Sequence, residues 1–309
     1  MRALALLLVL VACAPAAPVP KVVPASGEAA EPKRPPEPRI ARFVIGALPA
    51  FALKDGDLHE KNDAQTFGLG HAPAEIDALL GAPSPTLDLS IQPLLVRDGE
   101  RVLLFDTGAL RPPWAPGAGA LLASLALTGI APGAVTDIFL SHHHDDHVGG
   151  LLDPKGALAF PKARIHLTAP EWKAMQATKD QADVVAAITP QVVPFQPGAE
   201  LLASVRAVPV DGHTPGHSAY EIHSGAARLL YLGDATHHSV ISVRRPGWPV
   251  DYDEDKALAA ASREALLARV ATEQLRVYGV HFPFPGLGTI TRTQAGFAFV
   301  ADNEPRDLR

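Results

Sequence analysis

The segment from Ser141 to Gly150 concentrates side chains that can bind metal ions. It reads Ser-His-His-His-Asp-Asp-His-Val-Gly-Gly, so the pattern His-x-His-x-Asp-His runs from His142 to His147. Imidazole nitrogens and carboxylate oxygens are ligands that zinc, manganese, cobalt and iron accept. The segment therefore predicts a metal site.

The spacing within this segment divides the candidate ligands into two groups. His142 and His144 are two residues apart, so on an extended segment both side chains point the same way and could share one ion. Asp146 and His147 follow after the chain has begun to turn, which suits a second ion nearby. Because one segment supplies too few ligands for two ions, others are needed downstream. The candidates there are His217 in Gly-His-Thr-Pro-Gly-His, Asp234 after Leu-Gly, and His281 after Gly-Val.

The elements that must position these residues alternate between strands and helices. The mostly apolar residues 135–140 predict a strand that ends at the His-rich segment. Asp98-Gly99, between residues 91–96 and 101–105, predicts a hairpin. Further strands are expected at residues 42–45, 50–53, 204–209, 228–232 and 276–280, and helices at 74–80, 118–127, 169–178 and 253–270. This order is typical of a layered α/β fold such as an αββα sandwich.

Composition and the N-terminal residues indicate an exported protein with one large folded domain. The 309 residues are 47% hydrophobic and carry a net charge of -6 without a basic cluster, which argues against a nucleic-acid partner. Residues 1–13 form a short apolar run that ends in Leu-Val-Ala-Cys and resembles a lipoprotein signal. We therefore expect lipidation of Cys13, a disordered Pro/Ala-rich tether at 14–39, and a folded domain at 40–309. The protein would then be anchored to the bacterial cell envelope on the periplasmic side; an ordinary secretory signal is the alternative.

Taken in order, the ligand motifs resemble those of the metallo-β-lactamase superfamily, from about residue 40 to the end of the chain. The resemblance implies an αββα sandwich with two divalent ions, zinc before manganese, cobalt or iron. It implies that His142, His144 and His217 bind the first ion, that Asp146, His147 and His281 bind the second, and that Asp234 bridges them. In that pattern His143, Asp145 and His213 are not ligands, and Asp106 in Asp-Thr-Gly orients a ligand from behind.

Such a pair of ions would hold a bridging hydroxide for hydrolysis, with Asp146 handling its proton. Residues 246–255 and 280–286 look like the superfamily branch of methyl parathion hydrolase and exported lactonases, which implies small apolar lactones, esters or phosphotriesters as substrates and a possible homodimer. By that likeness Phe282, Phe284 and Trp248 line the pocket and His237, with His238, reaches the substrate; core packing or a solvated loop are the alternatives.

Two features of the sequence limit this interpretation. The acyl-homoserine lactonases of the superfamily place a tyrosine in the site, whereas here no tyrosine follows Asp234 until Tyr252. An iron-dependent oxidoreductase on the same fold, related to sulfur dioxygenases or flavodiiron proteins, is the alternative function. Flavodiiron proteins carry glutamate at the position of His144, and no flavodoxin-like domain follows here. A binding lipoprotein without activity is a third hypothesis, disfavoured because all seven ligand positions are present.

Overall fold

The computed structural model describes residues 37–110 and 112–302. They all belong to one compact unit. The predicted signal peptide, Cys13 and nearly all of the predicted tether lie outside the described residues. Within the described ranges, no helix is both long enough and apolar enough to cross a bilayer.

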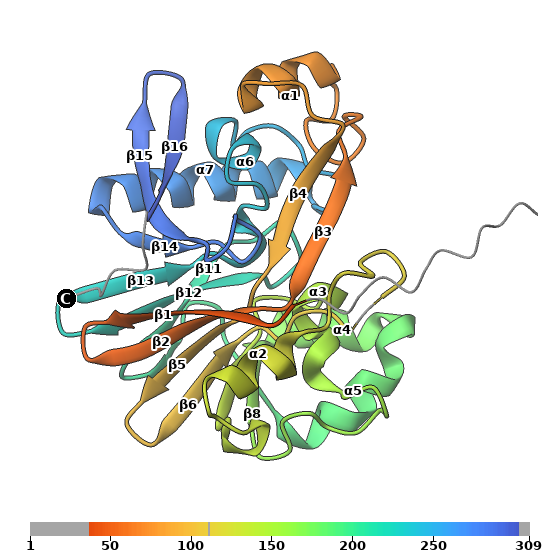
Figure 1. The fold of residues 1–309 in the computed structure, drawn as a ribbon, viewed down its shortest axis with the longest axis vertical. Coiled ribbons are helices and arrows are strands. Elements are labelled where there is room, and N and C mark those ends of the chain that lie inside the picture. The colour runs from red at the N-terminus through yellow and green to blue at the C-terminus, as the bar shows by residue number, and fades with distance from the viewer. Residues whose placement is uncertain (1–36, 111, 303–309) are drawn as a thin grey trace, which may run out of the picture. The chain divides into compact units, whose positions relative to one another are not determined.

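Most strands belong to two seven-stranded sheets (Figure 1). The first sheet has the order β1-β2-β5-β6-β7-β8-β9. Its strands are β1 Arg39–Ile45, β2 Leu48–Lys54, β5 Leu94–Asp98, β6 Arg101–Phe105, β7 Asp137–Phe139, β8 Arg164–Thr168 and β9 Val192–Phe195. Strands β6 to β9 run parallel to one another, whereas β1, β2, β5 and β6 pair antiparallel.

The strands of the second sheet lie in sequence order from β10 to β16, and only β13 and β14 are parallel in it, joined by the crossover that contains α7. Its strands are β10 Glu200–Leu202, β11 Val205–Pro209, β12 Ser218–Ser224, β13 Ala227–Tyr231, β14 Arg276–Tyr278, β15 Leu287–Thr293 and β16 Gly296–Ala301. A separate hairpin is made of β3 Gly56–Lys61 and β4 Thr86–Ile91.

The core has three layers, because side chains of successive strand residues point to opposite faces. On β2, Ala52 packs in the cluster between the two sheets, and its neighbour Phe51 packs in the cluster on the outer face of the first sheet. Helices α2, α4 and α5 cover that outer face, and α7 covers the outer face of the second sheet. This arrangement confirms the predicted αββα sandwich.

The four predicted helices, observed as α1, α2, α4 and α7, lie close to their predicted positions, whereas α3, α5 and α6 were not predicted. Their bounds are α1 Pro73–Leu80, α2 Leu121–Leu127, α3 Asp145–Val148, α4 Ala169–Ala177, α5 Ala182–Ile188, α6 Ile241–Arg244 and α7 Lys256–Glu273. Short 3-10 turns are η1 Pro132–Ala134, η2 Gly149–Leu151, η3 Lys179–Gln181, η4 Thr189–Gln191 and η5 Gly233–Ala235. Helix α7 begins later than predicted because the Asp255 side chain accepts from the Leu258 N–H at 3.0 Å and caps it.

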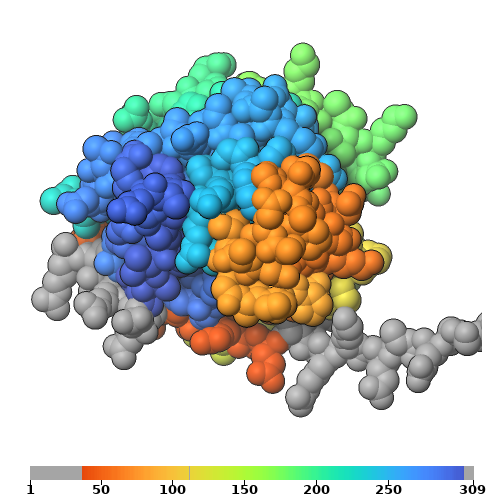
Figure 2. Space-filling model, turned by 90° about the horizontal axis from the view of Figure 1, so that it is seen from above, coloured from red at the N-terminus to blue at the C-terminus, as the bar shows by residue number. Residues whose placement is uncertain are grey.

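The β3–β4 hairpin, which sequence patterns did not predict, and the predicted helix α1 form a subdomain beside the second sheet (Figure 1). The predicted strand at 91–96 was wrong at its start, because Ile91 ends β4 and β5 begins only at Leu94. The hairpin and α1 pack against α6 through a fourth apolar cluster that includes Leu58, Ile76 and Ile241. On the surface, the segment of the hairpin and α1 adjoins that of α6 (Figure 2). This subdomain forms one wall of the cavity described below.

Candidate metal centre

The candidate ligands follow the carboxyl ends of neighbouring strands. Asp106 directly follows β6, the segment 141–147 follows β7, Asp234 follows β13, and His281 follows β14. Strands β6 and β7 are parallel neighbours, and so are β13 and β14. Because the carboxyl ends of parallel neighbours meet at one edge of a sheet, each sheet delivers its polar side chains to one place.

One group consists of three imidazoles, from His142, His144 and His213, whose ligand atoms lie within 4.8 Å of one another. His213 Nε2 lies 3.1 Å from His142 Nε2 and 3.0 Å from His144 Nδ1. Zinc–nitrogen bonds in tetrahedral geometry put ligand nitrogens roughly 3.3 Å apart. The three atoms therefore fit one shared zinc ion.

A second group consists of Asp146, His147 and His281. The Nε2 atoms of the two imidazoles lie 3.2 Å apart. Asp146 Oδ2 lies 3.6 Å from His147 Nε2 and 3.4 Å from His281 Nε2. Two nitrogens and one carboxylate oxygen at these distances fit a second ion.

Asp234 lies between the two groups with one carboxylate oxygen toward each. Its Oδ1 lies 3.1 Å from His281 Nε2 and 3.2 Å from His147 Nε2. Its Oδ2 lies 3.5 Å from His213 Nε2 and 3.8 Å from His142 Nε2. This is the placement expected of a carboxylate that bridges two ions.

Comparison with known proteins agrees with this geometry. The sequence profile of the metallo-beta-lactamase superfamily matches residues 88–281, a range that contains every residue of both groups and Asp234. The chain belongs to the metallo-beta-lactamase superfamily. This superfamily member resembles lactonases in structure, and its His/Asp clusters could hold metal ions.

Several relatives of this superfamily member are known. AidC, a dizinc quorum-quenching lactonase solved in complex with a product, is 29% identical with a TM-score of 0.80, covering 86% of this chain and 98% of that one. Hydrolase AbOPH is 24% identical with a TM-score of 0.77, covering 85% and 97%, and shows the fold. A probable metallo-hydrolase of Mycobacterium tuberculosis is 29% identical over 123 residues, which cover 34% of this chain and only 38% of that relative.

The structure places His213, and not the predicted His217, with the other two imidazoles of the first group. His217 is buried, but its Nε2 accepts a hydrogen bond from the Asp234 backbone N–H at 2.9 Å. It therefore holds the turn that carries the bridging carboxylate instead of facing the other two imidazoles. Two histidines flank the Thr-Pro-Gly turn; the motif resemblance pointed to His217, and the structure brings His213 to His142 and His144.

Three of the imidazoles are oriented from behind by acceptors at Nδ1, which leaves Nε2 directed into the cluster. Asp106 Oδ2 lies 2.8 Å from His147 Nδ1, as expected for the supporting role predicted for it. Asp253 Oδ1 lies 3.0 Å from His213 Nδ1, and the Ser90 carbonyl lies 2.8 Å from His281 Nδ1. Each partner fixes the tautomer that can bind a metal.

Two buried charged residues hold the ligand loops together. Glu171 is fully buried; its Oε1 accepts from the His143 N–H at 2.9 Å, and its Oε2 accepts from the Thr214 hydroxyl at 2.8 Å. One carboxylate thus joins the loop of His142 and His144 to the loop of His213. Arg263 on α7 donates to Asp253 Oδ2 at 2.7 Å and to the Ala235 carbonyl at 2.8 Å.

Burial favours the neutral imidazoles that metal binding requires. It lowers the pKa of His142 and His213 well below the ordinary value, and it also lowers the pKa of His144. A neutral imidazole keeps a lone pair on one nitrogen, so the first group is ready to bind a cation without first releasing protons.

The second group carries an excess of carboxylate. Burial acts to lower the pKa of His147, but the carboxylates of Asp234, Asp146 and Asp106 outweigh it and hold that pKa well above its ordinary value. These carboxylates stabilise positive charge at His147 Nε2. In the metal-free protein a bound proton supplies that charge, and a divalent metal ion at the same nitrogen would supply it instead. The donor set thus fits the metal that the family implies.

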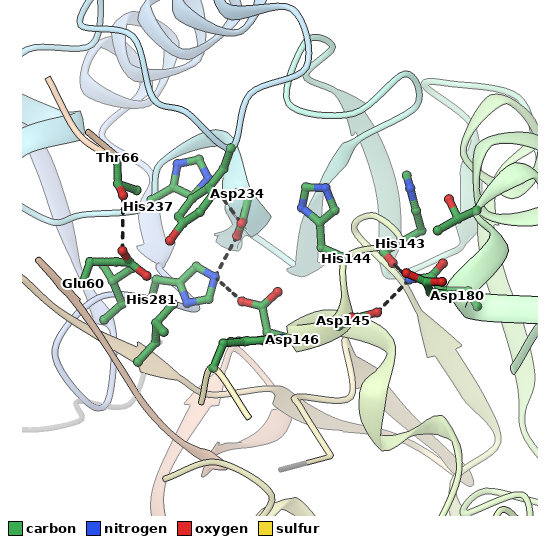
Figure 3. A pocket seen from close by; sticks show the side chains of 16 residues that line it. Glu60, Thr66, His143, His144, Asp145, Asp146, Asp180, Asp234, His237 and His281 are labelled. Carbon is green, nitrogen blue, oxygen red and sulfur yellow. Dashed lines mark hydrogen bonds and ion pairs between the residues drawn. The ribbon is translucent and has the colours of Figure 1, made fainter. Parts of the chain in front are cut away.

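The cluster lies at the floor of a cavity of about 630 Å³ (Figure 3). Asp146, Asp234 and His281 face the middle of the cavity, with His144 beside them. His237 also lines it, as predicted for a residue that reaches the substrate. Its ring is buried, and neither ring nitrogen makes a hydrogen bond.

The three aromatic residues predicted to line the cavity do not line it. Phe282 is fully buried in the core between α7 and the second sheet. Phe284 packs against the core between the sheets, and the ring of Trp248 stacks on the ring of His71 at 3.9 Å. The alternative of ordinary packing is correct for these positions. The cavity takes its aromatic surface from Trp114 and Tyr252 instead.

His238 does not line the cavity either. Its Nδ1 accepts from the N–H groups of Val240 and Ile241 at 3.1 and 3.2 Å, so it organises the turn before α6. Sequence reasoning missed the roles of His213, Asp253 and Glu171. The Gly-His-Thr-Pro-Gly-His motif gave a signal for His213, whereas the two carboxylates lie in helical or irregular segments without a motif.

Proposed function

We propose that this protein is a dinuclear metal-dependent hydrolase that cleaves lactones and related esters. The observation that carries the proposal is the position of Asp234, which directs one oxygen toward each of two metal-capable groups at the floor of a cavity. Two divalent ions bound by these groups would lower the pKa of a water molecule and polarise a carbonyl or phosphoryl oxygen.

The residues around the ions divide the remaining work. Asp146 is half-buried and lines the cavity, so one carboxylate oxygen can accept a proton from the attacking water and deliver it to the leaving oxygen. The ester C–O bond breaks, the oxygen of water stays on the acyl carbon, and the leaving oxygen takes the proton. His237 lines the cavity with its Nε2 3.3 Å from Asp234 Oδ2 and its Nδ1 without a hydrogen bond, which suits the ring to bind the substrate's carbonyl or ring oxygen beside the ions.

The size and lining of the cavity support a small organic substrate. A volume of about 630 Å³ lies within the usual range for such ligands, about 300–1,000 Å³. Leu58, Leu89 and Trp114 contribute apolar surface to the wall. The similarity to AidC over 86% of this chain supports a lactone before a phosphotriester.

The test compares kcat/KM for a long-chain lactone and an aryl phosphotriester on protein loaded with zinc or with manganese. The proposal predicts turnover of the lactone and its loss, together with part of the metal, in Asp234→Ala. Glu264→Ala, which changes an exposed carboxylate on α7, is the matched control and keeps both activity and metal. Undiminished turnover with full metal content in Asp234→Ala would exclude the proposed bridging role. A colourless, zinc-loaded enzyme that hydrolyses lactones would also exclude the iron-dependent oxidoreductase.

A further inference from the structure

The cavity is lined by more carboxylates than the metal centre uses. Five line it: Asp146 and Asp234 at the centre, and Glu60, Asp145 and Asp180 outside it. Among the described residues of the lining there is no lysine or arginine. Two divalent ions would offset four of the five negative charges, so a negative charge remains beside the metal centre.

These outer carboxylates flank the centre on two sides (Figure 3). Glu60 lies on the side of His281, and Asp145 and Asp180 lie beyond His144. If the acyl carbon of a substrate lies at the ions, its acyl chain and its alcohol part extend toward opposite sides of the cavity. Each part would then lie next to one of these carboxylates. In a cavity partly closed to water, such charges act more strongly than on an open surface.

Glu60 is the outer carboxylate that its neighbours hold in place. It is half-buried on β3, and its Oε2 accepts from the Thr66 hydroxyl at 3.2 Å. Tyr252 also forms a hydrogen bond with Glu60; burial first and this bond second raise the pKa of the Tyr252 hydroxyl. Two hydroxyl groups from different loops thus fix the carboxylate at the cavity wall.

Aromatic surface lies in the same cavity. The Trp114 side chain lines it and is 46% exposed, which is unusual for so large an apolar ring, and the Tyr252 ring forms part of the wall. Aromatic faces combined with a carboxylate are the groups that bind ammonium ions, through cation–π attraction and direct charge. In the same cavity the buried ring of His237 has an Nδ1 atom without a hydrogen bond, a further polar atom that a ligand would satisfy, while its Nε2 lies 3.3 Å from Asp234 Oδ2.

We propose that the cavity selects esters or lactones that carry an ammonium group over neutral substrates of the same shape, with Glu60 as the main specificity-determining residue. This inference rests on the proposed hydrolase function and adds the substrate class. The ammonium group takes no part in the chemistry: water cleaves the ester to a carboxylate and an alcohol, and the charge of the ammonium group is unchanged.

The experiment uses a pair of substrates that differ only in charge. Butyrylcholine and 3,3-dimethylbutyl butyrate have the same shape, because a tert-butyl group replaces the trimethylammonium group. Their kcat/KM values are measured by proton release on the zinc-loaded protein, together with a long-chain lactone. We expect butyrylcholine to be preferred about tenfold, which corresponds to about 1.4 kcal/mol.

Two variants assign the preference to its residue. In Glu60→Gln, where an amide oxygen can still accept from Thr66, the preference falls to about twofold or less. Glu264→Gln, the same change on the exposed face of α7, keeps the preference. Inhibition by choline relative to 3,3-dimethylbutanol is a second readout that does not depend on the chemical step, and it weakens in Glu60→Gln as well.

Each other outcome has one meaning. Equal rates for the two esters, a faster neutral ester, or a preference unchanged in Glu60→Gln overturns the inference and leaves the hydrolase function intact. Hydrolysis of the lactone but of neither ester also overturns it. If the loaded protein hydrolyses none of the three substrates, the proposed function itself is wrong.

Discussion

Replacing His213 and His217 one at a time by alanine distinguishes a metal ligand from a residue that supports the backbone. Both side chains are buried imidazoles at the two ends of one turn, so each change removes the same atoms from a similar environment. His213 Nε2 lies 3.0 and 3.1 Å from the nitrogens of His144 and His142. His217 Nε2 instead accepts from the Asp234 N–H.

The expected magnitudes follow from these contacts. Loss of a partner behind a ligand costs about 10–100-fold in metal affinity, so loss of the ligand itself in His213→Ala costs more than about 100-fold at the first ion. His217→Ala leaves the Asp234 N–H buried without an acceptor, at a cost of about 1–3 kcal/mol in folding free energy. The His217→Ala variant keeps all six side chains of the two groups, and the side chain of Asp234, unchanged.

The assay is the zinc content of each variant after dialysis against a weak chelator, together with urea unfolding of the metal-free protein. His213→Ala is expected to retain about one zinc per chain, and it also lowers the stability of the metal-free protein because buried Asp253 Oδ1 loses its partner. His217→Ala is expected to retain two zincs at reduced stability. If His217→Ala loses a zinc and His213→Ala keeps both, the assignment of the first group is refuted.

Three further predictions concern residues that support the site. Asp253→Asn removes the anion behind His213 Nδ1 and should weaken one zinc site about 10–100-fold in a chelator competition, leaving the other unchanged. Glu171→Gln should lower the denaturant midpoint of the metal-free protein, since one carboxylate holds two ligand loops; unchanged stability would contradict that role. Burial lowers the pKa of His238 to about 4 in the folded protein. As the pH falls below 6.5, His238 therefore takes up a proton in the unfolded chain before it does so in the folded one. The stability that is present above pH 6.5 is lost progressively as the pH falls toward 4. His238→Gln should flatten this part of the pH profile of urea unfolding.

Apolar periodicity predicted the strands with nearly continuous apolar runs, because both sheets are buried on both faces. It did not predict β8, β9, β10, β12, β15 and β16. The runs that became β2, β6 and β13 are almost continuously apolar, and such runs are typical of buried strands. The β3–β4 hairpin was missed because its strands carry charged residues such as Asp57 and Glu60, and Ile91 read as the start of the next strand. The pairing of β3 with β4 depends on packing against distant residues, which local sequence patterns do not reveal.

The metal centre was predictable where ligand type and spacing carry the information. His142, His144, Asp146 and His147 lie within six residues, and the structure brings them together as expected. Spacing alone could not predict which histidine of the Thr-Pro-Gly turn joins the first group. The answer depends on which of the two accepts the hydrogen bond from the Asp234 backbone N–H, and that residue is His217.

The cavity wall was the least predictable part of the site. Proximity in sequence to His281 placed Phe282 and Phe284 in the wall, but their side chains point into the packed cores of the sandwich. Tyr252 and Glu60 come from segments distant in sequence that meet only when the hairpin subdomain packs beside the second sheet. A tyrosine therefore does line the site, although it does not follow Asp234 closely.

The central claim is that two metal ions held by the two groups and Asp234 make this protein a hydrolase. The most direct measurement is a zinc titration of the metal-stripped protein while the hydrolysis rate of a long-chain lactone is recorded. The account predicts a rate that reaches its plateau at two zincs per chain. Two bound zincs without hydrolysis of lactone, ester or phosphotriester, or full activity at one zinc, would contradict it.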